Sequence, residues 1–255
     1  MKRDAKRNAN TSAAQKRKGP IQPGPGSLLP PAAASLTDRF PVPGEGWLEG
    51  DIVSDDVLIP HIAEKLLTGR NPTFFPGPLL LWGWTEATRI RAAAALELVG
   101  AIPGINVIPM PDYRPIYPKI DPEAVINPCH PNLTIWHNKI EVGLFMDAHC
   151  HFVNVMMKMI RAGTNCYTIA LCANDTHEDA IASLGWVDLA KLAKLRHAIV
   201  ALRDSGKVIP WAQTAAGKTE IALRKDRKAE TKKQLDHYLS GLGHELAVGL
   251  DEHAE

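Results

Sequence analysis

The segment Asp147-Ala148-His149-Cys150-His151 carries side chains that are well suited to metal chemistry. In an extended chain the side chains of His149 and His151 point to the same side, so their two imidazoles can hold one metal ion. A metal ion held there would activate a water molecule for hydrolysis, with Asp147 beside it. One hypothesis is therefore a free-standing metal-dependent enzyme that uses Asp147, His149 and His151.

The length of the chain argues against a hydrolase of the amidohydrolase kind at this segment. Such enzymes begin their metal site with a His-x-His pair and build a (β/α)8 barrel around it, which takes about 250 residues. Only roughly 100 residues follow His151, and the last of them look like a tail. We therefore interpret the segment as a histidine-rich turn between a strand and a helix, and we assign no metal ligand and no catalytic residue.

Other cysteine and histidine side chains could assemble a metal or iron–sulfur site once the chain folds. Their spacing is irregular and includes no CxxC pair, and the cysteines lie in or beside apolar runs. Because an unpaired cysteine is often a small core residue, we favour burial for structural reasons. The residues concerned are Cys129, His130, His149, Cys150, His151, Cys166, Cys172 and His177.

The turn Gly83-Trp84-Thr85 is a second candidate for binding. We predict a strand over 79–82, a tight turn at Gly83 and a helix over 85–99 that Thr85 caps. The free N–H groups at the start of that helix attract an anion. A Rossmann fingerprint and a P-loop are both absent, so the dinucleotide signal is weak. Trp84 either stacks on a flat ring or packs in the core, and we favour packing.

Short apolar runs alternate with helical segments along the middle of the chain. Further strands are predicted over 105–108, 142–146 and 166–172, and further helices over 57–68, 151–162 and 186–204. This alternation indicates an α/β fold with a doubly wound, mostly parallel, Rossmann-like sheet that helices cover on both faces. Ligands bind such sheets beyond the carboxyl ends of the strands, which include Gly83 and Asp147 in this prediction.

The two ends of the chain differ from its middle. Residues 1–45 combine basic side chains with clustered proline and glycine, which predicts a disordered tail, and 207–255 read as a charged helical extension. An α/β domain over 46–206 remains between them. The net charge of +1 and the lack of a long apolar run or a secretory signal lead us to expect a cytoplasmic protein with no nucleic acid or membrane partner.

Three stretches of the middle region carry a resemblance to a known family. They are Arg70-Asn71-Pro72 with the following PLLLWG (78–83), the segment 142–171, and the segment 172–192. Together they resemble the small subunit of the anaerobic carbon monoxide dehydrogenase/acetyl-CoA synthase complex, the archaeal epsilon subunit or carbon monoxide dehydrogenase beta-subunit family. The resemblance covers about residues 50–205.

The resemblance implies a Rossmann-like fold of the DHS, sirtuin-related type. It implies a non-catalytic partner of the large nickel–iron–sulfur subunit, in a homo- or hetero-oligomer, and a site for FAD or another dinucleotide. We place that site on Gly83, Trp84, Thr85, Asp147, Ala148 and His149. The long tails, a proline-rich crossing over 109–131 and the histidine-rich turn depart from the family, so a scaffold subunit of another oxidoreductase complex stays an alternative.

Overall fold

The computed structural model describes residues 39–110, 126, 129–230 and 233. The chain divides into two compact units, residues 1–211 and 212–255, and the described part of the second unit is helical over 215–230. The predictions for the N-terminal tail up to residue 38 and for most of the proline-rich crossing lie outside the described residues. None of the helices in the described ranges has both the length and the apolar character needed to cross a bilayer.

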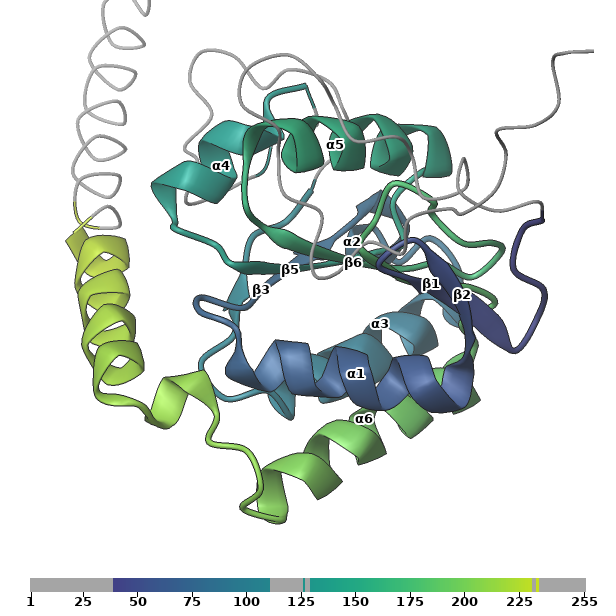
Figure 1. Cartoon of the computed structure of the whole chain (residues 1–255). Coiled ribbons are helices and arrows are strands. Elements are labelled where there is room, and N and C mark those ends of the chain that lie inside the picture. The colour runs from purple at the N-terminus through teal and green to yellow at the C-terminus, as the bar shows by residue number, and fades with distance from the viewer. Residues whose placement is uncertain (1–38, 111–125, 127–128, 231–232, 234–255) are drawn as a thin grey trace, which may run out of the picture. The chain divides into compact units, whose positions relative to one another are not determined.

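A seven-stranded mixed sheet forms the centre of the first unit (Figure 1). The strands are β1 (Glu45–Leu48), β2 (Asp51–Ser54), β3 (Thr73–Pro76), β4 (Asn106–Val107), β5 (Val142–Met146), β6 (Tyr167–Leu171) and β7 (Ala182–Leu184). Their order in the sheet is β2-β1-β7-β6-β5-β3-β4. Strands β3 to β7 are parallel, and β1 pairs antiparallel with β2 and β7. The predicted mostly parallel α/β sheet is therefore confirmed.

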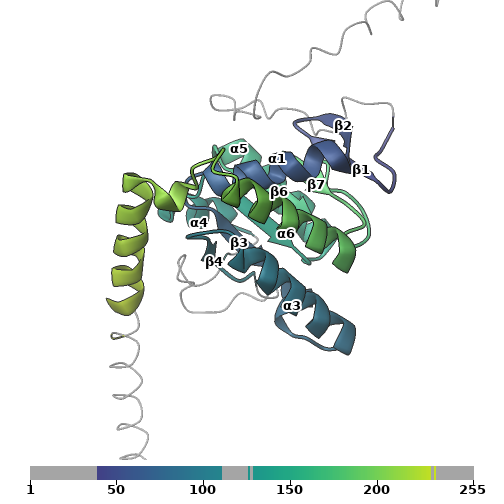
Figure 2. The same ribbon diagram turned by 90° about the horizontal axis from the view of Figure 1, so that it is seen from below.

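Helices cover both faces of this sheet. They are α1 (Asp55–Thr68), α2 (Pro78–Leu81), α3 (Glu86–Gly100), α4 (Pro131–His137), α5 (Cys150–Gly163) and α6 (Leu189–Asp204). On one face α4 packs against α5, and on the other α6 lies between α1 and α3 (Figures 1 and 2). Each central strand is thus buried on both sides, as the predicted alternation of strands and helices requires.

Successive side chains of the central strands belong to two different hydrophobic cores. Phe74 packs in the core that α1, α3 and α6 share, whereas Phe75 packs in the core beside α4 and α5. Leu144 and Phe145 divide in the same way, because neighbouring residues of a strand point to opposite faces. The rings of Phe75 and Phe145 stack with their centroids 4.5 Å apart, which joins β3 to β5.

The strand predicted over 79–82 is wrong, because this part of the chain is the short helix α2. Proline has a fixed φ that suits the first turn of a helix, and Pro78 occupies that position. The strand in this part of the chain is β3, which ends just before α2. A run of four apolar residues is too short to show the periodicity of hydrophobic residues that distinguishes a buried strand from a buried helix.

The predicted helix after Gly83 is confirmed as α3. Gly83 has a φ of 54°, in the left-handed region that glycine enters freely. The Thr85 hydroxyl accepts a hydrogen bond from the Thr88 N–H, and the Thr88 hydroxyl accepts one from the Thr85 N–H. This reciprocal capping box fixes where α3 begins.

Asn71 joins the amino ends of β3 and β5. Its backbone has a φ of 49°, which asparagine tolerates better than most residues with a side chain. Its buried amide donates hydrogen bonds to the carbonyl oxygens of Asn138 and Lys139 at 3.1 and 3.2 Å. The Arg70-Asn71-Pro72 motif therefore has a structural role in connecting two loops.

His61 on α1 is expected to make the stability of the fold depend on pH. Its Nε2 lies 2.9 Å from the Tyr167 hydroxyl, and burial together with the Lys65 ammonium lowers the pKa of His61. A lowered pKa means that the neutral imidazole stabilises the fold fully above about pH 6.5, and that this stabilisation is lost as the pH falls further. The midpoint of urea denaturation should therefore decrease when the pH is lowered from about 7.5 to about 5.5, and the decrease should be smaller in His61→Gln.

The control for this prediction is His197→Gln, at an exposed histidine of α6. This variant should keep the pH dependence of the wild-type midpoint. An unchanged pH dependence in His61→Gln would contradict the prediction.

Candidate functional site

The carboxyl ends of β3 and β5 mark the point where the chain changes direction across the sheet. From β3 the chain moves outward to β4, whereas from β5 it moves the opposite way to β6. Ligands bind α/β sheets in the crevice at such a switch point. In this protein main-chain hydrogen bonds close the crevice between the ends of β3 and β5. The Gly77 N–H donates to the Met146 carbonyl at 2.8 Å, and the Leu79 N–H donates to the Asp147 carbonyl at 3.2 Å.

The six residues predicted to hold a cofactor lie in two turns of the first unit. The turn 83–85 follows α2 rather than a strand, and the turn 147–149 directly follows β5. Arg91 of α3 connects this helix to the second turn, because its guanidinium donates two hydrogen bonds to the Asp147 carboxylate. It also donates one to the Val187 carbonyl at 2.5 Å, so three segments meet around one arginine.

Asp147 positions the turn after β5 through its ion pair with Arg91. The Asp147 side chain is only 5% exposed, and its backbone has a φ of 56°, which is uncommon for a residue with a side chain. A bidentate arginine–carboxylate pair restrains both the Asp147 side chain and the backbone of its turn. Both carboxylate oxygens accept from Arg91, so Asp147 acts on its own turn rather than on a ligand.

The two helix N-termini at these turns differ in how well they suit an anion. At α3 the capping box already uses the Thr88 N–H, and Glu86 places a carboxylate in the first turn. At α5 the first turn contains no acidic residue, and the His149 side chain makes no capping hydrogen bond. The macrodipole favours an anion at both ends, but at α3 the Glu86 carboxylate already supplies the negative charge and is paired with Arg89. The turn 147–149 therefore fits a phosphate better than the turn 83–85.

Trp84 does not pack in the core, so the favoured interpretation of this residue is wrong. Its side chain is 64% exposed, and Trp82 is 53% exposed. The connection from β3 to α3 contains only the four residues of α2 as regular structure, and Leu80 and Pro78 are the residues of α2 that are buried. The two tryptophans are left at the surface with the partly exposed Leu81.

Asp147, His149 and His151 do not converge as the metal-dependent enzyme hypothesis requires. Helix α5 begins at Cys150, so His151 lies in a helix and not on an extended strand. The two imidazoles stack with an angle of 25° between their planes, His151 is exposed, and the ligand atoms that converge in the described part of the chain belong to other side chains. With Asp147 bound to Arg91, the geometry of a shared metal site is not formed by these three side chains.

Cys150, Cys172 and His177 instead come together next to this turn. Cys150 is the first residue of α5, Cys172 directly follows β6, and His177 lies in the loop 173–181 that leads to β7. The two Sγ atoms are 3.8 Å apart, and candidate ligand atoms of all three side chains lie within 4.8 Å of one another. Cys150 and Cys129 are exposed, so the expectation of burial is wrong for these two, whereas Cys166 and Cys172 are buried as expected.

The thiols of Cys150 and Cys172 have different pKa values because their surroundings differ. Burial opposes the ionisation of Cys172, but a hydrogen bond with His177 and the backbone N–H groups of Asn174 and Asp175 outweigh it and lower the pKa of Cys172 to about 7. Burial of its sulfur and the nearby Cys172 raise the pKa of Cys150 to about 11, although the residue as a whole is exposed. Cys172 is therefore the thiol of the pair that ionises around neutral pH, while Cys150 stays protonated.

We expect the thiolate absorbance of the reduced, chelator-treated protein to rise with a midpoint near pH 7. This step should belong to Cys172, be missing in Cys172→Ser and move to higher pH in His177→Gln, which removes the imidazole from the thiolate. The control is Cys129→Ser, at an exposed cysteine outside the cluster, which should keep the step. A wild-type titration whose first step lies near the ordinary cysteine pKa of about 8.5 would contradict the prediction.

The sequence places these three residues among eight candidate ligands but does not show that they converge, because Cys172 is 22 positions from Cys150. The available signal was the position of each residue relative to a strand. Cys150 and Cys172 follow two neighbouring parallel strands, and parallel strands end at the same edge of a sheet.

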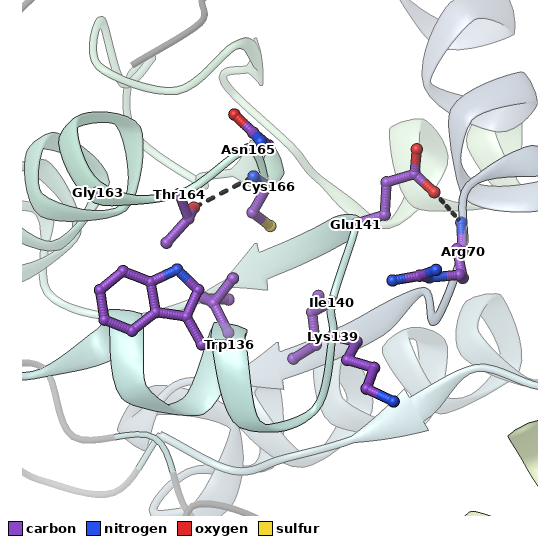
Figure 3. Close-up of a pocket in the computed structure, with 10 residues that line it drawn as sticks. Arg70, Trp136, Lys139, Ile140, Glu141, Gly163, Thr164, Asn165 and Cys166 are labelled. Carbon is purple, nitrogen blue, oxygen red and sulfur yellow. Dashed lines mark hydrogen bonds between the residues drawn. The ribbon is translucent and has the colours of Figure 1, made fainter. Parts of the chain in front are cut away.

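A pocket of about 550 Å³ lies at the opposite edge of the sheet, beside the amino ends of β3, β5 and β6 (Figure 3). Its lining includes the ring of Trp136 and the cationic side chains of Arg70 and Lys139. At this pocket the Glu141 carboxylate accepts a hydrogen bond from the backbone N–H of Arg70 at 2.8 Å. This pocket is thus separate from the turns 83–85 and 147–149.

These observations define a class of protein, a mostly parallel α/β subunit or enzyme with thiol, imidazole and guanidinium groups around the carboxyl ends of its central strands. Within that class, the chain belongs to the family described as CO dehydrogenase beta subunit/acetyl-CoA synthase epsilon subunit, whose family model matches residues 38–198. The match confirms the resemblance found in the sequence and spans all seven strands and helices α1 to α5. No curated protein matches the chain.

Proposed function

We propose that this protein is an accessory, non-catalytic subunit of a one-carbon oxidoreductase complex of the carbon monoxide dehydrogenase/acetyl-CoA synthase type. The observation that carries the proposal is the family match over 38–198, because members of this family are described as subunits of such assemblies. In this proposal the sheet is a Rossmann-like domain of the DHS type, and its partner is the large nickel–iron–sulfur subunit.

The exposed segment around α2 supports a docking role. Leu81, Trp82, Trp84 and Ile90 are between 39% and 64% exposed within ten residues of chain. Tryptophan is enriched at protein interfaces and often contributes most of the binding energy there. We therefore assign the partner contact to this segment.

The test is to co-express the full chain with the large nickel–iron–sulfur subunit of the same organism and to measure how much of that subunit is retained. The double variant Trp82→Ser/Trp84→Ser should lower retention at least about tenfold. The matched control is Trp136→Ser, which removes a similarly exposed tryptophan (58%) at the other edge of the sheet. Equal retention by both variants would overturn the docking assignment, and no retention by the wild type would favour a scaffold of another oxidoreductase complex.

We also propose a subsidiary site for FAD or another dinucleotide on the turns 83–85 and 147–149. The features in its favour are the uncapped, acid-free N-terminus of α5, which suits a phosphate, and the exposed indole of Trp84, which can stack on a flat ring. Asp147 and Arg91 would hold the turn in place.

Thermal shift and equilibrium dialysis with FAD, FMN, NAD and CoA test this second proposal independently of the partner. Binding should weaken in Trp84→Ser and in His149→Ala, and it should persist in Trp136→Ser. A protein that stays colourless and shows no shift with any of the four compounds would remove the cofactor from the proposal but leave the subunit role intact.

A further inference from the structure

We infer that Cys150, Cys172 and His177 bind one zinc ion at the carboxyl ends of β5 and β6. The inference does not depend on the proposed subunit role. It rests on three donor atoms that converge from different parts of the chain, on the spacing of the two sulfurs, and on a side chain that orients the histidine.

The distance between the two sulfurs matches a zinc site. Zinc–thiolate bonds are about 2.3 Å long and meet at roughly the tetrahedral angle, which places two ligand sulfurs about 3.8 Å apart. The Sγ atoms of Cys150 and Cys172 are 3.8 Å apart. A metal ion can therefore enter between them without a change in the positions of β6 and α5.

Asn154 orients the third donor, His177. The Nδ1 of His177 lies 2.8 Å from the Asn154 side-chain oxygen, which can only accept a hydrogen bond, so Nδ1 carries the proton. Nε2 is then the nitrogen that makes the hydrogen bond with the Cys172 sulfur in the metal-free protein, and a metal ion would take the place of the proton in that hydrogen bond. Histidines that bind zinc usually donate their other ring N–H in this way.

The backbone around the cluster holds His177 and Cys172 firmly. The His177 N–H donates to the hydroxyl of the fully buried Ser183 at 2.7 Å. The Cys172 N–H donates to the Leu184 carbonyl, and its carbonyl accepts from the Val187 N–H, which extends the pairing of β6 with β7. Such preorganised ligands reduce the ordering that metal binding would otherwise require.

Two thiolates and one imidazole leave a fourth coordination position. A tetrahedral zinc ion with Cys2His ligands keeps that position for water or another small ligand, as catalytic zinc sites do. Cys150 and residues 173–175 are exposed, so both the ion and a fourth ligand have a path from solvent. The donor set suits zinc, because soft thiolates with imidazole select it over magnesium or calcium.

The main competitor is a disulfide between Cys150 and Cys172. A disulfide would account for two of the three side chains but not for the imidazole with its oriented Nε2. We therefore favour the metal, and the experiment below distinguishes the two.

The test uses the full chain, expressed with zinc in the medium and purified without chelators under a phosphine reductant. Elemental analysis should find one zinc per chain, and zinc should protect both cysteines from alkylation. Replacement by cobalt should produce the thiolate charge-transfer and visible bands of a tetrahedral site. Cys150→Ser, at an exposed position, should lower zinc affinity by at least about 100-fold, more than the loss of an outer-shell partner does. The matched controls are Cys129→Ser and His197→Gln, which should keep stoichiometric zinc.

Asn154→Ala provides a finer prediction, because it leaves all three ligands in place. Zinc affinity should fall about 10- to 100-fold, as is typical when the partner of a ligating histidine is removed. Asn165→Ala, at an exposed asparagine just after α5, should leave it unchanged.

Three results would overturn the inference. They are substoichiometric zinc in the reduced wild type, retention of zinc by Cys150→Ser, and stoichiometric iron or copper in place of zinc. A Cys150–Cys172 disulfide that forms in air while zinc fails to bind the reduced protein would assign the pair to redox chemistry instead.

Discussion

Replacing Asp179 by alanine should lower the free energy of unfolding by about 3–5 kcal/mol. The Asp179 carboxylate is fully buried, and one oxygen lies 2.9 Å from Nη2 of Arg161, whose side chain is 3% exposed. The other oxygen lies 3.3 Å from the Lys158 ammonium. Removing the carboxylate leaves the Arg161 guanidinium in the interior without this counter-charge, which is the costly way to disrupt a buried ion pair. Urea denaturation of the full chain measures the change.

Two further variants distinguish the contribution of the buried Asp179–Arg161 pair from that of the more exposed Asp179–Lys158 pair. Lys158→Ala removes the half-exposed partner of the same carboxylate and should cost less than about 1 kcal/mol. Arg161→Met combined with Asp179→Ala should recover part of the loss, because apolar side chains of similar volume often replace a buried pair without penalty. A loss below about 1 kcal/mol for Asp179→Ala alone would contradict the prediction.

This ion pair also connects stability to the cysteine–histidine cluster. Asp179 and His177 lie in the same loop, and Arg161 lies on α5, the helix that begins with Cys150. The pair therefore attaches the loop to the helix that carries another ligand of the inferred zinc ion. Asp179→Ala should weaken zinc binding as well, whereas Lys158→Ala should not.

The sequence was sufficient for those elements that carry their own start and stop signals. The strand 142–146 was predicted with its observed bounds, and α3 follows the predicted glycine turn and threonine cap. Both elements are defined by local features. The strand is an apolar run with an acidic residue on either side, and the helix has a capping residue before an alanine-rich segment.

Strands β1, β2 and β7, which the sequence did not predict, depend on pairing that no local pattern shows. Strands β1, β2 and β7 have three or four residues each, and β1 pairs antiparallel with β7, more than 130 positions along the chain. A period of two residues cannot be recognised in so few positions. Their prediction needs the sheet that they complete.

The candidate site was predictable in part for the same reason. The sequence placed Asp147 at the end of a strand, and the structure confirms that position. It could not show that Arg91, 56 positions earlier, donates hydrogen bonds to the Asp147 carboxylate. Nor could it show that Cys150 and Cys172 lie side by side. These contacts are set by which strands are neighbours in the sheet, so they follow only once the strand order is known.

Gly77→Ala is expected to destabilise the fold by about 3 kcal/mol or more, although glycine-to-alanine changes are usually mild. A Cβ at this position would lie 2.4 Å from the Asp147 carbonyl oxygen and 2.5 Å from the Ala148 nitrogen. Both are backbone atoms, so neither can move aside as a flexible side chain would. The Gly77 N–H bond to Met146 and the ion pair of Asp147 with Arg91 hold the two strand ends together.

The matched control is Gly100→Ala, at the last residue of α3, where a Cβ would meet no atom within 4 Å. Because alanine has the higher helix propensity, this variant should be neutral or more stable by up to about 1 kcal/mol. Urea midpoints of the two variants give the comparison, and Gly77→Ala should also loosen the turn that bears Asp147 and so weaken any ligand binding there. Equal stability of the two variants would show that the ends of β3 and β5 can separate, and that the switch point can open into the crevice that its main-chain hydrogen bonds now fill.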